Sequence, residues 1–96
     1  SNERVFIMVK DLEYNEILVC FNPRIVKQSS KMVVMEEGCL SYPDEFIDVE
    51  RSETVIVKYE DENKVDHKIK LEGFAARVFL HEFDHMQGIN FTQRER

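Results

Sequence analysis

The chain has 96 residues, of which 43% are apolar, enough for one domain with a single modest core. Its formal net charge of −6 argues against a nucleic-acid or anionic-membrane surface, because both partners select basic patches. The sequence contains no apolar run as long as a membrane span and no apolar signal segment. Because no secretory signal is seen, its two cysteines, Cys20 and Cys39, are expected to be free thiols rather than a disulfide. We therefore expect a soluble intracellular protein in a reducing compartment.

Two short apolar runs near the start predict a β-hairpin. Residues 5–9 form the first run and residues 17–21 the second, and the polar stretch 10–16 between them suits a turn. Asn22 and Pro23 are expected to end the second strand, because proline cannot donate a hydrogen bond to a strand ladder. Cysteine is among the most buried residue types, so Cys20 is expected to fill space in the core.

Further strands are expected through the middle of the chain. In chain order, they are residues 25–26, 32–35, 46–50, 54–59 and 65–71. Residues 42–45 include a proline and are expected to form a turn. The last two strands are expected to form a second hairpin.

The hydrophobic period changes after Gly73. Apolar residues from 74 to 86 recur at helical spacing, and Gly88 supplies the expected stop just past the last helical residue. A helix of about four turns should then lie against the strands that precede it. We therefore predict an α+β fold, with mostly antiparallel strands and hairpins packed around one central metal-binding helix near the C-terminus.

The polar residues of this helix indicate a metal site. His81 and His85 are four residues apart, so their side chains project roughly 40° apart on a helix and can reach one ion. Glu82 lies on the flank of the same face, where it can touch water bound to that ion. A shared cation would also offset the cost of burying these groups and Asp84 in an apolar helix. The alternative is a core helix whose polar side chains are satisfied by neighbouring residues.

A third ligand has two candidates. A zinc metalloprotease would place it downstream, where Glu95 is the available residue, nearly at the end of the chain. Cys39 is the better candidate, because a thiolate is a strong ligand for zinc or Fe(II), and Gly38 beside it allows close approach of the backbone to a ligand. Three protein ligands leave the fourth position open for water, as a hydrolytic metal requires.

Two segments together resemble a known family. EGCLS at residues 37–41 and HEFDHMQG at residues 81–88 resemble the second and third signature motifs of peptide deformylase, which removes the N-formyl group from nascent polypeptides. The order and separation of the two motifs agree as well. The resemblance extends from the first predicted strand through the end of the helix.

The resemblance implies a small α+β fold and a ligand set for one divalent metal. Cys39, His81 and His85 would be the ligands, with Fe(II) as the native metal and zinc or nickel in many preparations. Glu82 would be the general base, and the backbone N–H of Leu40 would donate to the developing oxyanion. No other cofactor is implied.

The resemblance also implies a formyl-methionyl nascent peptide as the substrate. Its extended backbone is expected to add to a sheet edge beside Glu37 and Gly38, with the methionine side chain in an apolar pocket near Val78. Arg51 is similar to an arginine of the family. We expect it to be a structural ion-pair partner of Glu37 or Asp84 rather than a catalytic residue.

The sequence departs from the family pattern before its first strand. Deformylases carry there a glycine-rich motif ending in a glutamine that helps to hold the oxyanion, whereas only residues 1–4 precede this strand. Losing one such donor typically costs about a hundred- to a thousandfold in rate. Leu80 stands where the family usually has glutamine, and Phe46 where bacterial members often have a basic residue.

We therefore expect residues 1–96 to form one deformylase-like domain lacking its N-terminal segment, which could also be a separate chain. The alternatives are a divergent short enzyme and a catalytically impaired, metal-stabilised binding module. The expected partners are the formyl-methionyl peptide and the exit region of the ribosome. The expected location is the cytoplasm, for a bacterial or phage protein, or the matrix of an organelle.

Overall fold

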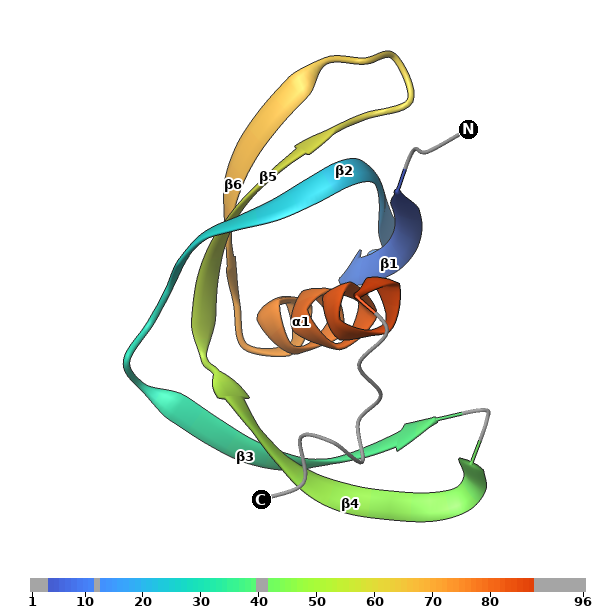
Figure 1. Ribbon diagram of the computed structural model, residues 1–96, viewed down its shortest axis with the longest axis vertical. Helices are drawn as coiled ribbons and strands as arrows, with labels where there is room; N and C mark the ends of the chain where they lie inside the picture. The colour runs from blue at the N-terminus through green and yellow to red at the C-terminus, as the bar shows by residue number, and fades with distance from the viewer. Residues whose placement is uncertain (1–3, 12, 40–41, 88–96) are drawn as a thin grey trace.

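A computed structural model of the chain describes residues 4–11, 13–39 and 42–87, without the side chains of residues 39 and 42–45. Within these ranges the chain forms six strands followed by one helix (Figure 1). The elements are β1 (Val5–Asp11), β2 (Glu16–Gln28), β3 (Met32–Cys39), β4 (Tyr42–Ser52), β5 (Thr54–Glu60), β6 (Asp66–Glu72) and α1 (Phe74–Met86).

The strands form two antiparallel sheets. One has four strands in the order β1-β2-β5-β6, and the other consists of β3 and β4. Both predicted hairpins, β1–β2 and β5–β6, are confirmed. Figure 1 shows α1 between the two sheets, with the strands curving around it. The predicted α+β class with one central helix is confirmed.

The prediction that Asn22 and Pro23 end the second strand is wrong. β2 continues to Gln28 and changes its partner from β1 to β5. Asn22 has a positive φ of 50°, and the register with β5 shifts between Phe21 and Arg24. Pro23 therefore lies in an irregularity where the ladder needs no N–H from it, and the strand bends there instead of ending.

The prediction of a turn at residues 42–45 is also wrong, because β4 begins at Tyr42. Cys39 pairs with Tyr42, whereas Gly38 pairs with Phe46, so residues 43–45 form a bulge with no partner in the β3 ladder. A proline is tolerated in such a bulge because its missing N–H costs no strand hydrogen bond.

The hydrophobic core lies between the four-stranded sheet and α1. Phe79 is fully buried, and its ring meets that of Phe6 edge-on, with the two centroids 5.2 Å apart. Cys20 is also fully buried in this core, as predicted, and burial raises the pKa of its thiol to about 12. The described helix α1 is too short and too polar to cross a membrane.

Candidate active site

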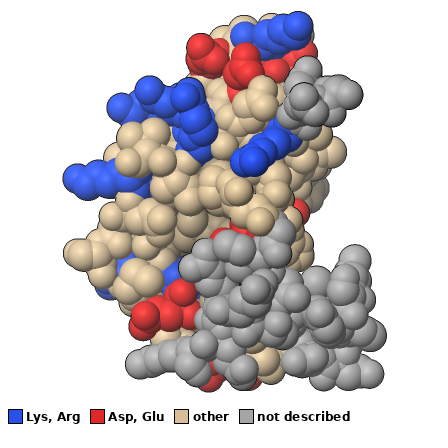
Figure 2. Space-filling model, viewed as in Figure 1, with Lys and Arg blue, Asp and Glu red and all other residues tan. Residues whose placement is uncertain are grey.

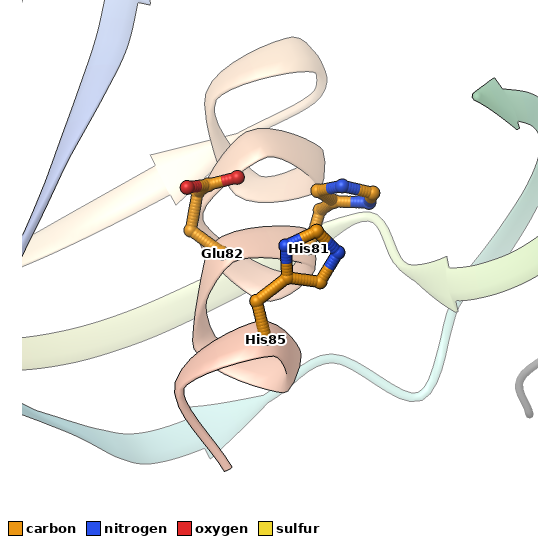
Figure 3. A group of neighbouring side chains, drawn as sticks. All are labelled: His81, Glu82 and His85. Carbon is orange, nitrogen blue, oxygen red and sulfur yellow. The ribbon is translucent and has the colours of Figure 1, made fainter. Parts of the chain in front are cut away.

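α1 brings together the three polar residues of its predicted metal face. The ligand atoms of His81, Glu82 and His85 all lie within 4.8 Å of one another, and the two imidazole centroids are 4.4 Å apart. Figure 3 shows the two rings side by side, with Glu82 on their flank. His81 and Glu82 are half-buried and His85 is exposed, so the cluster has one side open to solvent. The geometry therefore suits an ion that must also be reached by a substrate.

Glu37 on β3 fixes the imidazole of His81. The distance between His81 Nδ1 and Glu37 Oε1 is 2.7 Å. A carboxylate only accepts hydrogen bonds, so the proton is assigned to Nδ1 and Nε2 is the ring nitrogen oriented for a metal. Metal-binding histidines usually have such a carboxylate or carbonyl partner, which sets the tautomer and the ring orientation.

Two buried arginines donate to the same carboxylate. Arg51 donates from Nε at 2.6 Å and from Nη2 at 2.9 Å, and Arg77 donates from Nη1 at 2.6 Å. Burial alone would raise the pKa of Glu37, but hydrogen bonds from His81, Arg51 and Arg77 and the charge of Arg51 outweigh it. The pKa of Glu37 is therefore well below its usual range, and the group is ionised at neutral pH.

Arg51 links this carboxylate to α1. Its Nη1 donates to Asp84 Oδ2 at 2.8 Å, so it pairs with both Glu37 and Asp84. The sequence-based prediction that Arg51 is a structural ion-pair partner is confirmed. Asp84 lies between the two histidines of the helix face in sequence, and Arg51 therefore helps to fix the rotation of α1 against β4.

Sequence reasoning missed Arg77. Besides Glu37, this side chain donates to the carbonyl oxygens of Val49 at 2.9 Å and Val33 at 2.6 Å, so it ties α1 to both β3 and β4. The sequence did contain a signal for it, because Arg77 stands among apolar residues of the helix, and a buried arginine needs fixed hydrogen-bond acceptors. The identity of those acceptors could not be read from nearby sequence.

The remaining predicted residues surround the cluster or lie outside the described part. The carboxylate of Glu37 is occupied by donors, so a substrate would meet this stretch through its backbone. Gly38 lies under the ring of Phe46, whose Cε1 would be 2.6 Å from a Cβ at position 38. Val78 is half-buried and packs against the core. The backbone of Cys39 ends β3, but its side chain is outside the described residues, as are Leu40 and Glu95.

The chain is similar to peptide deformylases over its whole length. The polypeptide deformylase family model matches residues 1–96. Chloroplastic peptide deformylase 1B of Oryza sativa subsp. japonica is 46% identical over 79 residues, which cover 82% of this chain and 29% of that protein.

Solved structures agree with this similarity. Peptide deformylase from Thermotoga maritima superposes with a TM-score of 0.90 at 40% identity, covering 97% of this chain and 61% of that one. Class I type b peptide deformylase from Acinetobacter baumannii with Met-Ala-Ser bound gives a TM-score of 0.86 at 41% identity, covering 95% and 62%. The chain thus spans less than two thirds of each relative. Because the family model matches the entire chain, the chain belongs to the polypeptide deformylase family.

Proposed function

We propose that this chain removes the N-formyl group from N-formylmethionyl peptides of nascent proteins, by hydrolysis of the formamide C–N bond. The observation that carries the proposal is the cluster of His81, Glu82 and His85 on α1, with His81 oriented by Glu37, in a member of the deformylase family. A relative with Met-Ala-Ser bound supports a peptide that begins with methionine. Bacterial and chloroplastic relatives support a location in a bacterial cytoplasm or an organelle. We also propose that the chain acts at the ribosomal exit, where formylated nascent peptides emerge.

The family implies a catalytic divalent metal, and the donor set fits one. His81 through Nε2, His85 and Cys39 would hold the ion. Two imidazoles and a thiolate can bind Fe(II), which we propose as the native metal, and zinc or nickel, which would replace it in purified preparations. When bound, such an ion supplies a Lewis acid and makes a coordinated water acidic enough to lose a proton near neutral pH.

Glu82 is the proton carrier of the proposed reaction. Its carboxylate accepts a proton from the attacking water and later delivers it to the amine nitrogen as the C–N bond breaks, giving formate and a free N-terminus. The backbone N–H of Leu40 donates to the carbonyl oxygen while negative charge develops there. Glu82 is half-buried on the flank of the two histidines, where both a water and a substrate nitrogen can be reached.

The peptide is proposed to bind along β3. In the described part of the chain β3 pairs with β4 alone, so its other edge offers backbone groups at Glu37 and Gly38 to an extended strand. The methionine side chain would enter an apolar pocket near Val78. Backbone hydrogen bonds to this strand edge, which lies beside the proposed metal ligands, would align the end of a short peptide without many side-chain contacts.

The test is Glu82→Ala, assayed on formyl-Met-Ala-Ser with iron- or nickel-loaded protein. We expect formate release to fall about a hundred- to ten-thousandfold, because the proton carrier is lost. Metal content should stay at the level of the unaltered chain, since Glu82 is not a proposed ligand. The matched control is Glu72→Ala, an exposed acid of β6, which should leave formate release unchanged.

The Cys39→Ser variant tests the ligand set separately and should lower metal content sharply. Retained metal content in that variant would remove Cys39 from the site. Metal binding without formate release by the unaltered chain, even with the N-terminal segment of a relative added, would favour a binding module. Cleavage of internal peptide bonds would favour a metalloprotease.

A further inference from the structure

The outer face of the four-stranded sheet is basic. The strand register places Arg24, Lys58 and Lys68 side by side across β2, β5 and β6, and we call these three residues the basic row. The adjacent row in the same register consists of Lys27, Ile56 and Lys70. All five cations are exposed. This face therefore concentrates positive charge in a chain whose net charge is −6.

Most of these cations are not neutralised by neighbours. Among the residues that the structure describes, Lys70 pairs with Glu72 at 3.7 Å, and no ion pair involves Lys27 or any member of the basic row. By contrast, Lys10 and Lys31 elsewhere on the surface pair with acids at 3.3 Å and 3.0 Å. The positive potential of the basic row is thus available to a partner.

The surface around the basic row is hollowed. A hollow of about 600 Å³ is lined by the whole basic row and by Arg4, together with two acids, Glu60 and Asp66. Figure 2 shows several groups of Lys and Arg side chains over the upper half of the molecule, with a cluster of Asp and Glu side chains at its top, and Figure 1 places β2, β5 and β6 in this half. A hollow lined by cations fits a raised, negatively charged ridge better than it fits the flat surface of a lipid bilayer.

We propose that the basic row and its neighbouring lysines bind the sugar–phosphate backbone of folded RNA. Cations on adjacent strands lie roughly 5 Å apart and those two residues apart along a strand roughly 7 Å apart, so their long side chains can reach separate phosphates. Double-stranded RNA is recognised mainly by its shape, phosphates and 2′-hydroxyls. The two aromatic residues that line the hollow, Tyr59 and His67, stack on each other with ring centroids 5.1 Å apart, and Tyr59 is buried. Stacking of RNA bases on them is therefore disfavoured, which favours a duplex over a single strand.

This surface revises the expectation drawn from the net charge. A negative total argues against nucleic-acid binding only if the charges are spread evenly, because binding responds to the local potential within about a Debye length, roughly 8 Å at physiological salt. On this face the flanking rows of the register add three acids, Glu60, Asp66 and Glu72, to the five cations, so positive charge remains in excess. The RNA surface is separate from the residues proposed for deformylation.

The test measures binding of the full 96-residue chain to a labelled RNA duplex of about 20 base pairs by fluorescence anisotropy at several salt concentrations. The unaltered chain should bind with an affinity that falls linearly with salt on logarithmic axes. The triple variant Arg24→Gln, Lys58→Gln, Lys68→Gln should bind about tenfold more weakly or worse, and its salt slope should fall by about 2 to 3.

The matched control removes the same number of charges elsewhere, through Lys10→Gln, Lys31→Gln and Lys64→Gln. It should keep an affinity within about threefold of the unaltered chain, and circular dichroism should show that both variants are folded. Equal losses in the two variants, or no RNA binding by the unaltered chain, would overturn the proposal. So would equally tight binding to anionic lipid vesicles or to polyglutamate, because the partner class would then be wrong.

Discussion

The two sheets hold the same helix by different forces. On the side of the four-stranded sheet, α1 buries Phe79 and Leu80 in an apolar cluster with residues of β1, β2, β5 and β6. On the side of β3 and β4, the contact is made by buried charges, in which Arg51 and Arg77 share the carboxylate of Glu37. In the part of the chain that the structure describes, every buried side-chain nitrogen and oxygen has a hydrogen-bond partner.

This difference assigns the orientation of the helix to its charged side. Apolar packing is non-directional, so it sets how close the helix lies to the sheet and tolerates small rotations. Hydrogen bonds between charged groups require defined directions, so the contacts of Arg51 to Asp84 and of Glu37 to His81 fix the rotation of α1 about its axis. A metal site built on one helix face needs that rotation fixed. The charged side of the helix is therefore expected to affect both metal binding and stability, and the apolar side to affect stability but not metal binding.

The largest effect is expected for Glu37→Gln, which breaks the charged side. Each oxygen of Glu37 accepts two hydrogen bonds, so an amide in either orientation turns its NH₂ towards two donors. We expect a loss of about 3–5 kcal/mol in the free energy of unfolding, measured by urea denaturation. In the folded variant, metal affinity should fall about ten- to a hundredfold, since the support of His81 is lost.

The control for this variant is Glu36→Gln, an exposed acid one position earlier on the same strand. Its unfolding free energy should stay within about 0.5 kcal/mol of the unaltered chain, and its metal affinity should not change. If both variants lost the same stability, or if Glu37→Gln kept full metal affinity, the charged side would have no orienting role.

A smaller effect is expected for Phe79→Leu, which weakens the apolar side. The shorter side chain leaves a cavity beside Phe6 and should cost about 1–2 kcal/mol in the free energy of unfolding. Metal affinity, measured by competition with a chelator where the variant is folded, should remain within about threefold. Phe74→Leu, at a half-exposed ring, is the control and should cost less than about 0.5 kcal/mol. A large loss of metal affinity in Phe79→Leu would show that packing also sets the orientation of the helix.

The sequence predicted the apolar side well because its signals are local. Alternation and helical spacing are visible within a dozen residues, and the spacing of His81 and His85 alone places both on one face. The course of β2 beyond Asn22 could not be predicted, because the positive φ that lets the strand continue is set by pairing with two different strands. The charged side was predicted in part, through Arg51. The contact of Arg77 with Glu37 joins residues 40 positions apart, and no local pattern specifies such a pair.

The smallest effect, and the most specific to the charged side, is a dependence of stability on pH. Folding lowers the pKa of Glu37, so the folded state binds a proton at this group less readily than the unfolded state. The stabilisation is complete above the unfolded pKa, about 4.3, and is lost as the pH falls further towards the lower folded pKa. Between pH 4 and pH 3 the unaltered chain should lose up to about 1.4 kcal/mol per pH unit more than Glu37→Gln, which has no group to titrate there. Urea denaturation at pH 7, 5, 4 and 3 measures the difference, with Glu36→Gln as the control that should keep the full dependence. Parallel pH profiles for the unaltered chain and Glu37→Gln would mean that the ionised carboxylate does not hold the helix to β3 and β4.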